Sequence, residues 1–344
     1  MKLRRVYFDC RSCAAGEYMA DWPLGVDGGQ TRQARRLLCL AGTSWSFAAS
    51  RANLREMCGL DVAANTVRNV CQAEAARVEQ WQANAPQAVE KYAKSSGEIE
   101  FFTDGTCVNT TEGWKEMRLG VSTKRPRGEP VLPAQWAKRT LPPAAARHVF
   151  AAIESADAFA ARWPLVASRL GIRSNGRIDV VADGARWIWD RVSLYWSAAV
   201  GTLDIYHALE HVTAASKALH GEGTDDARRW AEQARHVLLH EGHVGMKRLL
   251  AEARLLAVRG VQRRGIAALE HYLDAHAEHL RYAERLTEGR VIGSGQVEGA
   301  CKHWIGRRLK QTGARWRIER ANRMAGLCAL KYSDQWDSYW SQAA

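Results

Sequence analysis

Residues 177–190, RIDVVADGARWIWD, contain a short apolar run that ends in an Asp-Gly pair at Asp183. An apolar run of this length beside a turn signal predicts a buried β-strand. The glycine lets the backbone turn away, which leaves the carboxylate at the end of the strand. Because residues 187–199 are expected to be helical, the stretch predicts a strand, an acidic turn and a covering helix.

The same arrangement occurs in IEFFTDGT at residues 99–106, where Asp104 ends the apolar run. An Asp-Gly pair is a common turn signal, so one occurrence alone favours an ordinary turn. Two occurrences after buried strands leave both interpretations open: two turns, or two carboxylates held at one edge of a sheet.

A third acid, Glu298, lies in VIGSGQVEGACKHWIGRRLKQTGARW at residues 291–316, and we expect this segment to be helical. From Lys302 to Arg323 the sequence holds eight Lys or Arg and one acid, a net charge of +7. A first-turn glutamate after Ser294 can simply satisfy free backbone N–H groups. Alternatively, Glu298 binds a metal ion, the basic side chains hold phosphates, and the indoles stack on an unpaired base. The residues expected to contact DNA in this segment are Lys302, Trp304, Arg307, Arg308, Lys310, Arg315, Trp316 and Arg317.

Asp104, Asp183 and Glu298 supply the carboxylate oxygens that Mg²⁺ and Mn²⁺ prefer as ligands. Two such ions about 4 Å apart can activate the attacking oxygen and stabilise the leaving oxygen of an in-line displacement. We therefore expect these three residues to be catalytic and to bind two Mg²⁺ or Mn²⁺ ions over a phosphodiester.

The composition of the 344-residue chain favours a polyanionic partner. It has 49 basic and 37 acidic residues, a formal charge of +12, which indicates nucleic acid first. A basic protein without a specific partner is the plainer alternative. Eight cysteines in this length do not predict a disulfide framework. With no targeting signal and no membrane-length apolar stretch, we expect a soluble, cytosolic protein with no membrane partner.

The pattern of apolar residues predicts a mixed α/β fold. Strands are expected first and then strands that alternate with helices, which suggests a mixed sheet covered by helices. Residues 207–290 have the periodicity of helices throughout and separate Asp183 from Glu298. The expected strands are residues 98–108, 114–121, 131–138, 178–182 and 202–206, and residues 141–170 are expected to be helical.

The first third of the chain suggests two DNA-binding features. Residues 36–80 have the layout of a helix-turn-helix, with Gly59 at the turn and Asn65, Arg68 and Asn69 facing outward to read DNA. Small helices that only pack together are the alternative. In the irregular residues 1–35, Cys10 and Cys13 form a C-x-x-C knuckle and are candidate zinc ligands. A structural zinc site needs two such pairs, and no second pair follows at suitable spacing.

One motif suggests a different enzyme. His207, Glu210 and His211 match H-x-x-E-H, the inverted zinc-peptidase signature, with both histidines on one helix face. Glu298 could then be the third zinc ligand. This hypothesis ranks second, because it explains neither the basic segment nor the paired aspartates.

Taken together, four segments resemble a known family. FFTDGTCVNTTEGWKEMRLGV, VVADGARWIW, LDIYHALEHV and IGSGQVEGACKHWIGRRLKQTGARW occur in the order typical of Mutator-like DDE transposases, closest to the ISKra-type transposases of bacterial insertion sequences. The similarity runs from about residue 5 to the C-terminus. Members of the family usually carry another cysteine pair before the knuckle. We therefore expect an incomplete zinc ribbon at Cys10 and Cys13.

The resemblance implies a ribonuclease-H-like core with Asp104, Asp183 and Glu298 as the metal-binding triad. It places the family's Asp/Cys-x-x-His signature on Asp204 and His207, beside the active site. It also implies hydrolysis at transposon ends and attack of the 3′-OH on target DNA, by a homo-oligomer at the bacterial nucleoid. A DNA-binding remnant without catalysis is the third hypothesis. The expected division is a knuckle region at 1–35, a helical DNA-binding region at 36–95, the core at 96–215, an all-helical insertion at 216–290 and the core completion at 291–344.

Overall fold

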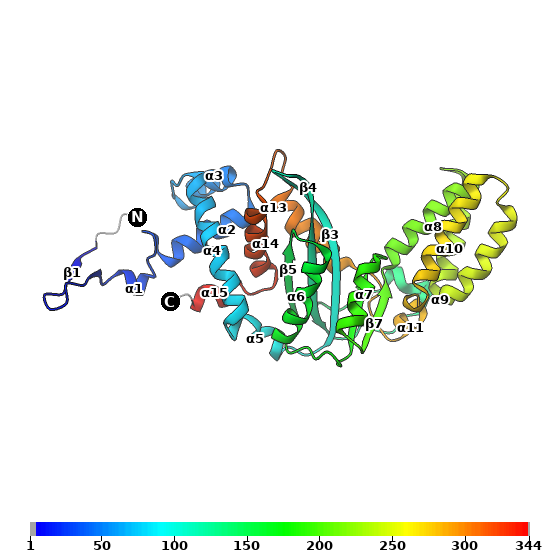
Figure 1. Cartoon of the computed structure of the whole chain (residues 1–344), viewed down its shortest axis with the longest axis horizontal. Helices are drawn as coiled ribbons and strands as arrows, with labels where there is room; N and C mark the ends of the chain where they lie inside the picture. The colour runs from blue at the N-terminus through cyan, green and yellow to red at the C-terminus, as the bar shows by residue number, and fades with distance from the viewer. Residues whose placement is uncertain (1–4, 343–344) are drawn as a thin grey trace.

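A five-stranded mixed sheet forms the centre of the molecule in the computed structural model, which describes residues 5–342 (Figure 1). The strand order is β5-β4-β3-β6-β7. Strands β3, β4 and β5 pair as an antiparallel meander, and β6 and β7 run parallel to β3. The strands are β3 (Glu98–Thr110), β4 (Gly113–Arg125), β5 (Ala146–Ala152), β6 (Ile178–Ala182) and β7 (Ala199–Leu203).

Both faces of the sheet are covered, because successive side chains of a strand point to opposite faces. Phe101 packs beneath the helices α6 (Ala156–Arg169) and α7 (Arg186–Tyr195). Its neighbour Phe102 packs on the other face, among residues of the N-terminal and C-terminal helices. The sheet is therefore the middle layer of three, in agreement with the expected mixed α/β class.

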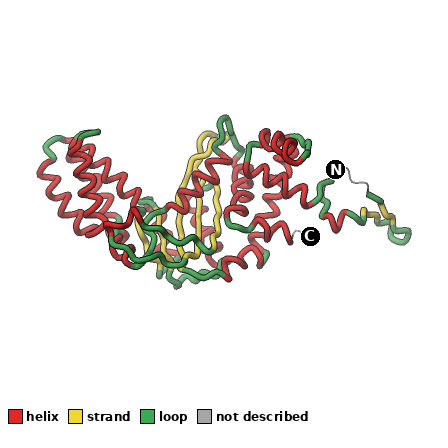
Figure 2. Tube along the Cα trace, turned by 180° about the vertical axis from the view of Figure 1, so that it is seen from behind, coloured by secondary structure: helices red, strands yellow, loops and turns green. Residues whose placement is uncertain are grey.

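The N-terminal helices share one hydrophobic core with the sheet and do not form a separate unit. The long helix α14 (Ile318–Tyr332) packs against both α4 and β5, so it links these helices to the sheet. Figure 2 shows the helices stacked beside the strands. The N-terminal helices are α2 (Arg32–Ser44), α3 (Phe47–Cys58), α4 (Ala64–Asn84) and α5 (Gln87–Lys94).

The block between β7 and the C-terminal segment is helical, as predicted, and has its own core. It projects from the end of the sheet in Figure 1. Gly242 has φ 58° and ψ −140° and bends the longest helix near its middle. Among residues 5–342 no helix is long and apolar enough to cross a membrane. The elements are α8 (Ile205–His220), α9 (Asp225–Leu256), α10 (Gly260–Ala275), the 3₁₀ turn η2 (Ala277–His279) and α11 (Tyr282–Thr287).

The basic C-terminal segment is not the continuous helix that the sequence predicts. Helix α12 (Gly295–Ala300) passes into a π-helical turn, η3 (Cys301–Gly306), and then into α13 (Arg307–Leu309). The chain then extends beside the tip of the β3–β4 hairpin, where the Thr111 N–H donates to the Trp316 carbonyl. Helix α14 follows, and α15 (Trp336–Gln342) ends the described chain.

Two other predicted elements differ from the structure. Residues 131–138, predicted as a strand, form a loop and the 3₁₀ turn η1 (Pro133–Lys138), since proline cannot donate to a strand ladder. The third antiparallel strand is β5 instead, inside the stretch 141–170 that was expected to be helical. Its pairing with β4 overrides the helical preference of its alanines. At the N-terminus, β1 (Tyr7–Asp9) and β2 (Gly16–Tyr18) form a small hairpin, followed by α1 (Asp21–Leu24).

Candidate active site

Three aspartates follow one row of paired residues across the sheet. Thr103 of β3 pairs with Ala182 of β6, and Ala182 pairs with Leu203 of β7. The next residues along the three parallel strands are Asp104, Asp183 and Asp204. The prediction that Asp104 ends its strand is wrong. Strand β3 continues beside β4 after its pairing with β6 stops. The row places these carboxylates at the edge where β3 separates from β6.

Glu298 is carried to the same edge by α12. The Ser294 hydroxyl lies 2.6 Å from Asp204 Oδ2 and 3.1 Å from Glu298 Oε1, so it bridges the two carboxyl groups. Lys302 Nζ lies 3.5 Å from Glu298 Oε2, one helical turn further on. The side chain of Glu298 thus faces Ser294 and Lys302 and does not cap free N–H groups, which was the alternative interpretation.

The charges of these acids influence one another. Burial raises the pKa of Asp104 most; the Gly105 N–H lowers it, and the negative charges of Asp183 and Glu298 raise it further. Burial also raises the pKa of Asp204, opposed by its hydrogen bonds with Ser294 and the Tyr206 N–H. Clustered, partly desolvated carboxylates of this kind are typical of functional sites, although structural networks also perturb pKa values.

Cys301 closes one side of the cluster. Its Sγ lies 3.9 Å from Asp104 Oδ2, and burial together with the Asp104 charge raises the pKa of the thiol to about 12. The thiol is therefore neutral at physiological pH, so it adds no further negative charge beside Asp104.

The donors suit a hard divalent cation, because the cluster offers carboxylate oxygens whose mutual repulsion such an ion would offset. Within residues 5–342, however, no three His, Cys, Asp or Glu side chains lie close enough together to hold a metal ion. The contacts of Glu298 with Ser294 and Lys302 give a physical reason for the open arrangement. The structure thus brings the predicted residues to one edge without closing them around a common point.

The histidines of the H-x-x-E-H motif lie beside this cluster, on α8. His207 Nε2 is 4.0 Å from Asp204 Oδ2, and its Nδ1 is 3.6 Å from Glu210 Oε2. The His211 ring stacks on Tyr272 with centroids 3.7 Å apart. His207 therefore faces the acids, whereas His211 is engaged with the helical insertion.

The helical insertion reaches the site through Tyr272 of α10, which the sequence did not single out. A Cβ added at Gly184, the residue after Asp183, would lie 2.4 Å from the Tyr272 ring. The ring therefore lies directly over the acidic turn. Burial raises the pKa of Tyr272, as do the charges of Asp183 and Asp204. Sequence reasoning also missed the bridging role of Ser294 and the thiol of Cys301, since both depend on tertiary contacts.

The predicted succession of helix, turn and helix is present as α3, a turn at Gly59 with φ 63°, and α4, and its role in reading DNA stays a prediction. Asn65 and Asn69 are exposed on the first turns of α4, and Arg68 is half-buried. Leu54, Val67 and Val70 are buried between these helices, whereas Met57 is 73% exposed. The layout leaves the proposed reading residues accessible.

The lysines and the tryptophans of the basic segment differ in their exposure to solvent. Lys302 and Lys310 are exposed close to the acids; Lys310 donates to the Thr106 hydroxyl on β3. Trp304 and Trp316, expected to stack on a base, are 5% and 9% exposed, so the expectation of free indole faces is wrong. Trp304 stacks on Tyr332, with ring centroids 5.8 Å apart.

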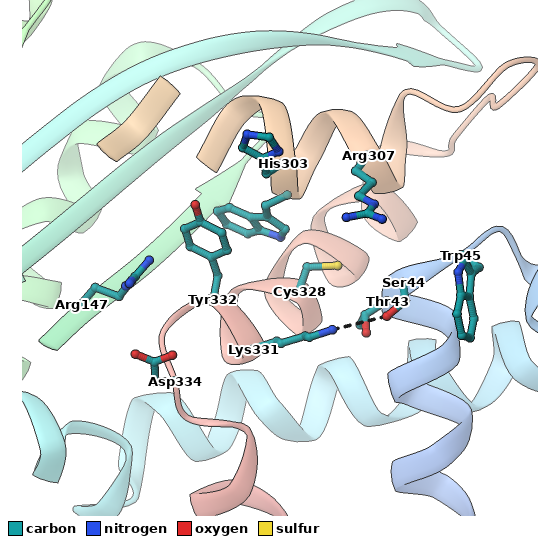
Figure 3. A pocket seen from close by; sticks show the side chains of 11 residues that line it. Thr43, Ser44, Trp45, Arg147, His303, Arg307, Cys328, Lys331, Tyr332 and Asp334 are labelled. Carbon is teal, nitrogen blue, oxygen red and sulfur yellow. Dashed lines mark hydrogen bonds between the residues drawn. The ribbon is translucent and has the colours of Figure 1, made fainter. Parts of the chain in front are cut away.

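Behind the Glu298 helix lies a hollow of about 500 Å³. In Figure 3, His303 and Arg307 project from one helix, and Lys331 and Tyr332 from another. Arg307 and Lys331 make no ion pair with a carboxylate among residues 5–342. The hollow is lined mainly by cationic and aromatic groups, and Arg307, a predicted DNA contact, is one of them.

Cys10 and Cys13 lie between the strands of the N-terminal hairpin, and both thiols are exposed. The Cys13 and Ser12 N–H groups lower the pKa of the Cys10 thiol, which favours the thiolate form that binds metals. No third ligand from the described residues joins them. The hairpin therefore presents two exposed thiols, and whether they bind zinc stays a prediction.

No family model matches this chain, and a search of curated proteins found no match.

Proposed function

We propose that the protein is a DNA transposase that cuts and joins DNA ends with the help of divalent metal ions. The observation that carries the proposal is the row of aspartates at the edge of the sheet, with Glu298 brought beside it by α12. These residues are far apart in the sequence, so their approach depends on the whole fold.

The arrangement of the strands supports a ribonuclease-H-like core. An antiparallel meander, followed by two strands parallel to its first member, matches the core that the resemblance implies. The helical block between β7 and α12 has the position expected for an insertion domain. Its Tyr272 covers the turn after Asp183, so the insertion helps to shape the proposed site.

In this proposal Asp104, Asp183 and Glu298 would hold Mg²⁺ or Mn²⁺. When bound, the ions would lower the pKa of the attacking water and stabilise charge on the leaving oxygen. Lys302 and Lys310, exposed beside the acids, bind phosphates of the DNA backbone. His207 and Asp204 act as positioning residues: Asp204 accepts from Ser294 and orients the segment that carries Glu298.

The test uses a supercoiled plasmid that carries the gene with its natural flanking DNA. The purified protein should nick this plasmid in Mg²⁺ or Mn²⁺ and leave it intact in EDTA. Asp104→Asn and Asp183→Asn should each lower the nicking rate by at least about 100-fold, since the metal contributes several kcal/mol to transition-state stabilisation.

Asp190→Asn is the matched control, because Asp190 is 65% exposed on α7 and its one ion pair within residues 5–342 is with Arg186 at 3.7 Å. Equal nicking by the wild type and Asp183→Asn would overturn the triad. Binding of DNA without any nicking would favour a non-catalytic remnant. Retained nicking in His211→Ala, together with no zinc in the purified protein, would exclude the zinc-peptidase alternative.

A further inference from the structure

A second pocket, of about 370 Å³, lies between the helix-turn-helix and the C-terminal segment. Its walls come from the start of α3, from α4, and from the chain between α13 and the first turn of α14. The charged side chains that line it are all arginines: Arg68, Arg308, Arg315, Arg317 and Arg320. These cations come from parts of the sequence about 250 residues apart.

None of the five arginines pairs with a carboxylate. Ion pairs are frequent elsewhere in the molecule, yet no Asp or Glu among residues 5–342 lies within 4.0 Å of these guanidinium groups. Arg315 instead donates to the Thr110 and Thr111 carbonyls. Like charges gathered without counter-charges repel one another, so the pocket is electrostatically incomplete without an anion.

Arg308 is the most informative member, because it is buried to 3% exposure. Its guanidinium lies 4.5 Å from the Phe47 ring centroid and 5.0 Å from that of Trp316, and Nε donates to the Gly42 carbonyl. Its Nη2 finds no hydrogen-bond acceptor in the described chain. A buried cation without a counter-charge is costly, and an anion in the pocket that Arg308 lines would offset this cost.

Two helix N-termini add to the positive potential. Helix α3 begins after Ser46 and α14 begins after Arg317, and both of these residues line the pocket. The α14 N-cap makes no side-chain hydrogen bond, so the free N–H groups of its first turn are not satisfied by a cap. Helix N-termini favour anions, and phosphate is the common biological example.

We infer that this arginine pocket binds a phosphate of the DNA backbone and so anchors DNA between the reading helix α4 and the catalytic sheet. The planar guanidinium fork of arginine suits phosphate oxygens. DNA is favoured over a free phosphate because Arg68 stands on the same helix as the exposed Asn65 and Asn69. The inference rests on the proposed function for its ligand, but it concerns binding and not cleavage.

The experiment measures binding of a fluorescein-labelled duplex of the gene's flanking DNA by anisotropy, in EDTA and over a series of salt concentrations. The test variants are Arg317→Ala and Arg320→Ala. Arg317 directly precedes α14 and Arg320 lies in its first turn, so neither residue is part of the proposed reading helix α4. Each should weaken binding on the order of tenfold and make the salt dependence shallower by about one counterion per lost phosphate contact.

The matched control is Arg264→Ala, an exposed arginine on α10 of the helical insertion. It should bind the duplex like the wild type. Equal melting temperatures would show that the variants are folded. Unchanged DNA binding in both α14 variants would overturn the inference. The same result, combined with calorimetric binding of inorganic phosphate that these variants lose, would assign the pocket to a free anion instead.

Because the binding experiment is done in EDTA, without divalent metal ions, its outcome does not depend on catalysis. Loss of DNA binding in the pocket variants, with no nicking by any protein, would support the pocket and contradict the proposed nuclease. Normal nicking with unchanged binding in the variants would support the nuclease and contradict the pocket.

Discussion

Asp104 is a residue whose charge opposes folding. Its pKa is raised, mainly by burial, so the folded protein disfavours the ionised form. Stability from such a group is fully present below its ordinary pKa and is lost as the pH rises through the raised value. At neutral pH the carboxylate therefore destabilises the native state, as is common for groups retained for function.

We predict that Asp104→Asn increases the free energy of unfolding at pH 7 by about 0.5–2 kcal/mol, the usual gain for a stabilising single substitution. The gain should disappear as the pH falls below about 4, where the wild-type carboxyl group is protonated in both states. Urea unfolding in EDTA at several pH values measures this difference. Asp190→Asn should show no gain, and a loss of stability in Asp104→Asn at pH 7 would contradict the prediction.

At the residue scale, the sequence allowed prediction of the acids but not of their contacts. Asp183 after its apolar run and Asp104 in a similar run could be identified because strand and turn signals are local. The Ser294 bridge, the Cys301 thiol and the Tyr272 ring come from other elements. The local pattern of apolar and polar residues holds no information about contacts between elements that are distant in the sequence.

At the scale of elements, β6 holds the sheet and the C-terminal part of the helical insertion together. Asp179 of this strand is 3% exposed and accepts from Arg285 Nη1 of α11 at 2.9 Å. It also accepts from Arg290, which is buried to 4% exposure. Arg290 also pairs with Glu98 and Glu288, whereas Asp179 is the one carboxylate among residues 5–342 that pairs with Arg285. Asp179 therefore supplies the counter-charge of the buried Arg285 beside the strand that leads to Asp183.

We predict that Asp179→Ala lowers the free energy of unfolding by about 3–5 kcal/mol, because removing this partner leaves the buried charge of Arg285 uncompensated. Urea unfolding followed by tryptophan fluorescence measures the change. Asp157→Ala is the control, since Asp157 pairs with Arg191 at 2.5 Å but its side chain is 78% exposed. A change below about 1 kcal/mol for Asp179→Ala, the range of exposed pairs, would show that the network contributes little.

The elements themselves were predictable to different degrees. The strand β6 matches the expected residues 178–182 because a short apolar run between polar flanks has few alternatives. The strand β5 was missed because its alanine-rich sequence has helical preference and becomes a strand only through pairing with β4. The break in the basic segment was missed for a similar reason: the chain at Trp316 extends to bond the β3–β4 hairpin.

Across the whole molecule, the helices proposed to read DNA and the sheet proposed to cut it are parts of one core. Helix α14 contacts α4 on one side and β5 on the other, so α4 is fixed relative to the acidic edge. Gln72 of α4 donates to the Arg320 carbonyl at 3.2 Å, which adds a polar link beside the arginine pocket. DNA held by α4 would therefore be held in a defined position relative to Asp104 and Glu298.

The unclosed acidic cluster has a consequence for the stability of the whole chain. If Asp104, Asp183 and Glu298 bind a divalent ion only in the folded protein, the ion should stabilise that protein by mass action. At ten times its dissociation constant the gain is about 1.4 kcal/mol. Mn²⁺ should therefore raise the melting temperature of the wild type above its value in EDTA, and the shift should grow with the logarithm of Mn²⁺ concentration.

Asp104→Asn and Asp183→Asn should reduce this shift strongly, whereas Asp190→Asn should retain it, since Asp190 lies exposed on α7 outside the cluster. The cysteine hairpin is a second metal-binding candidate, so Cys10→Ser in the same assay separates its contribution. An Mn²⁺ shift of equal size in Asp104→Asn, Asp183→Asn and the wild type would mean that the cluster binds no ion. Loss of the shift in the two aspartate variants alone would indicate that the open arrangement of the acids closes around the metal.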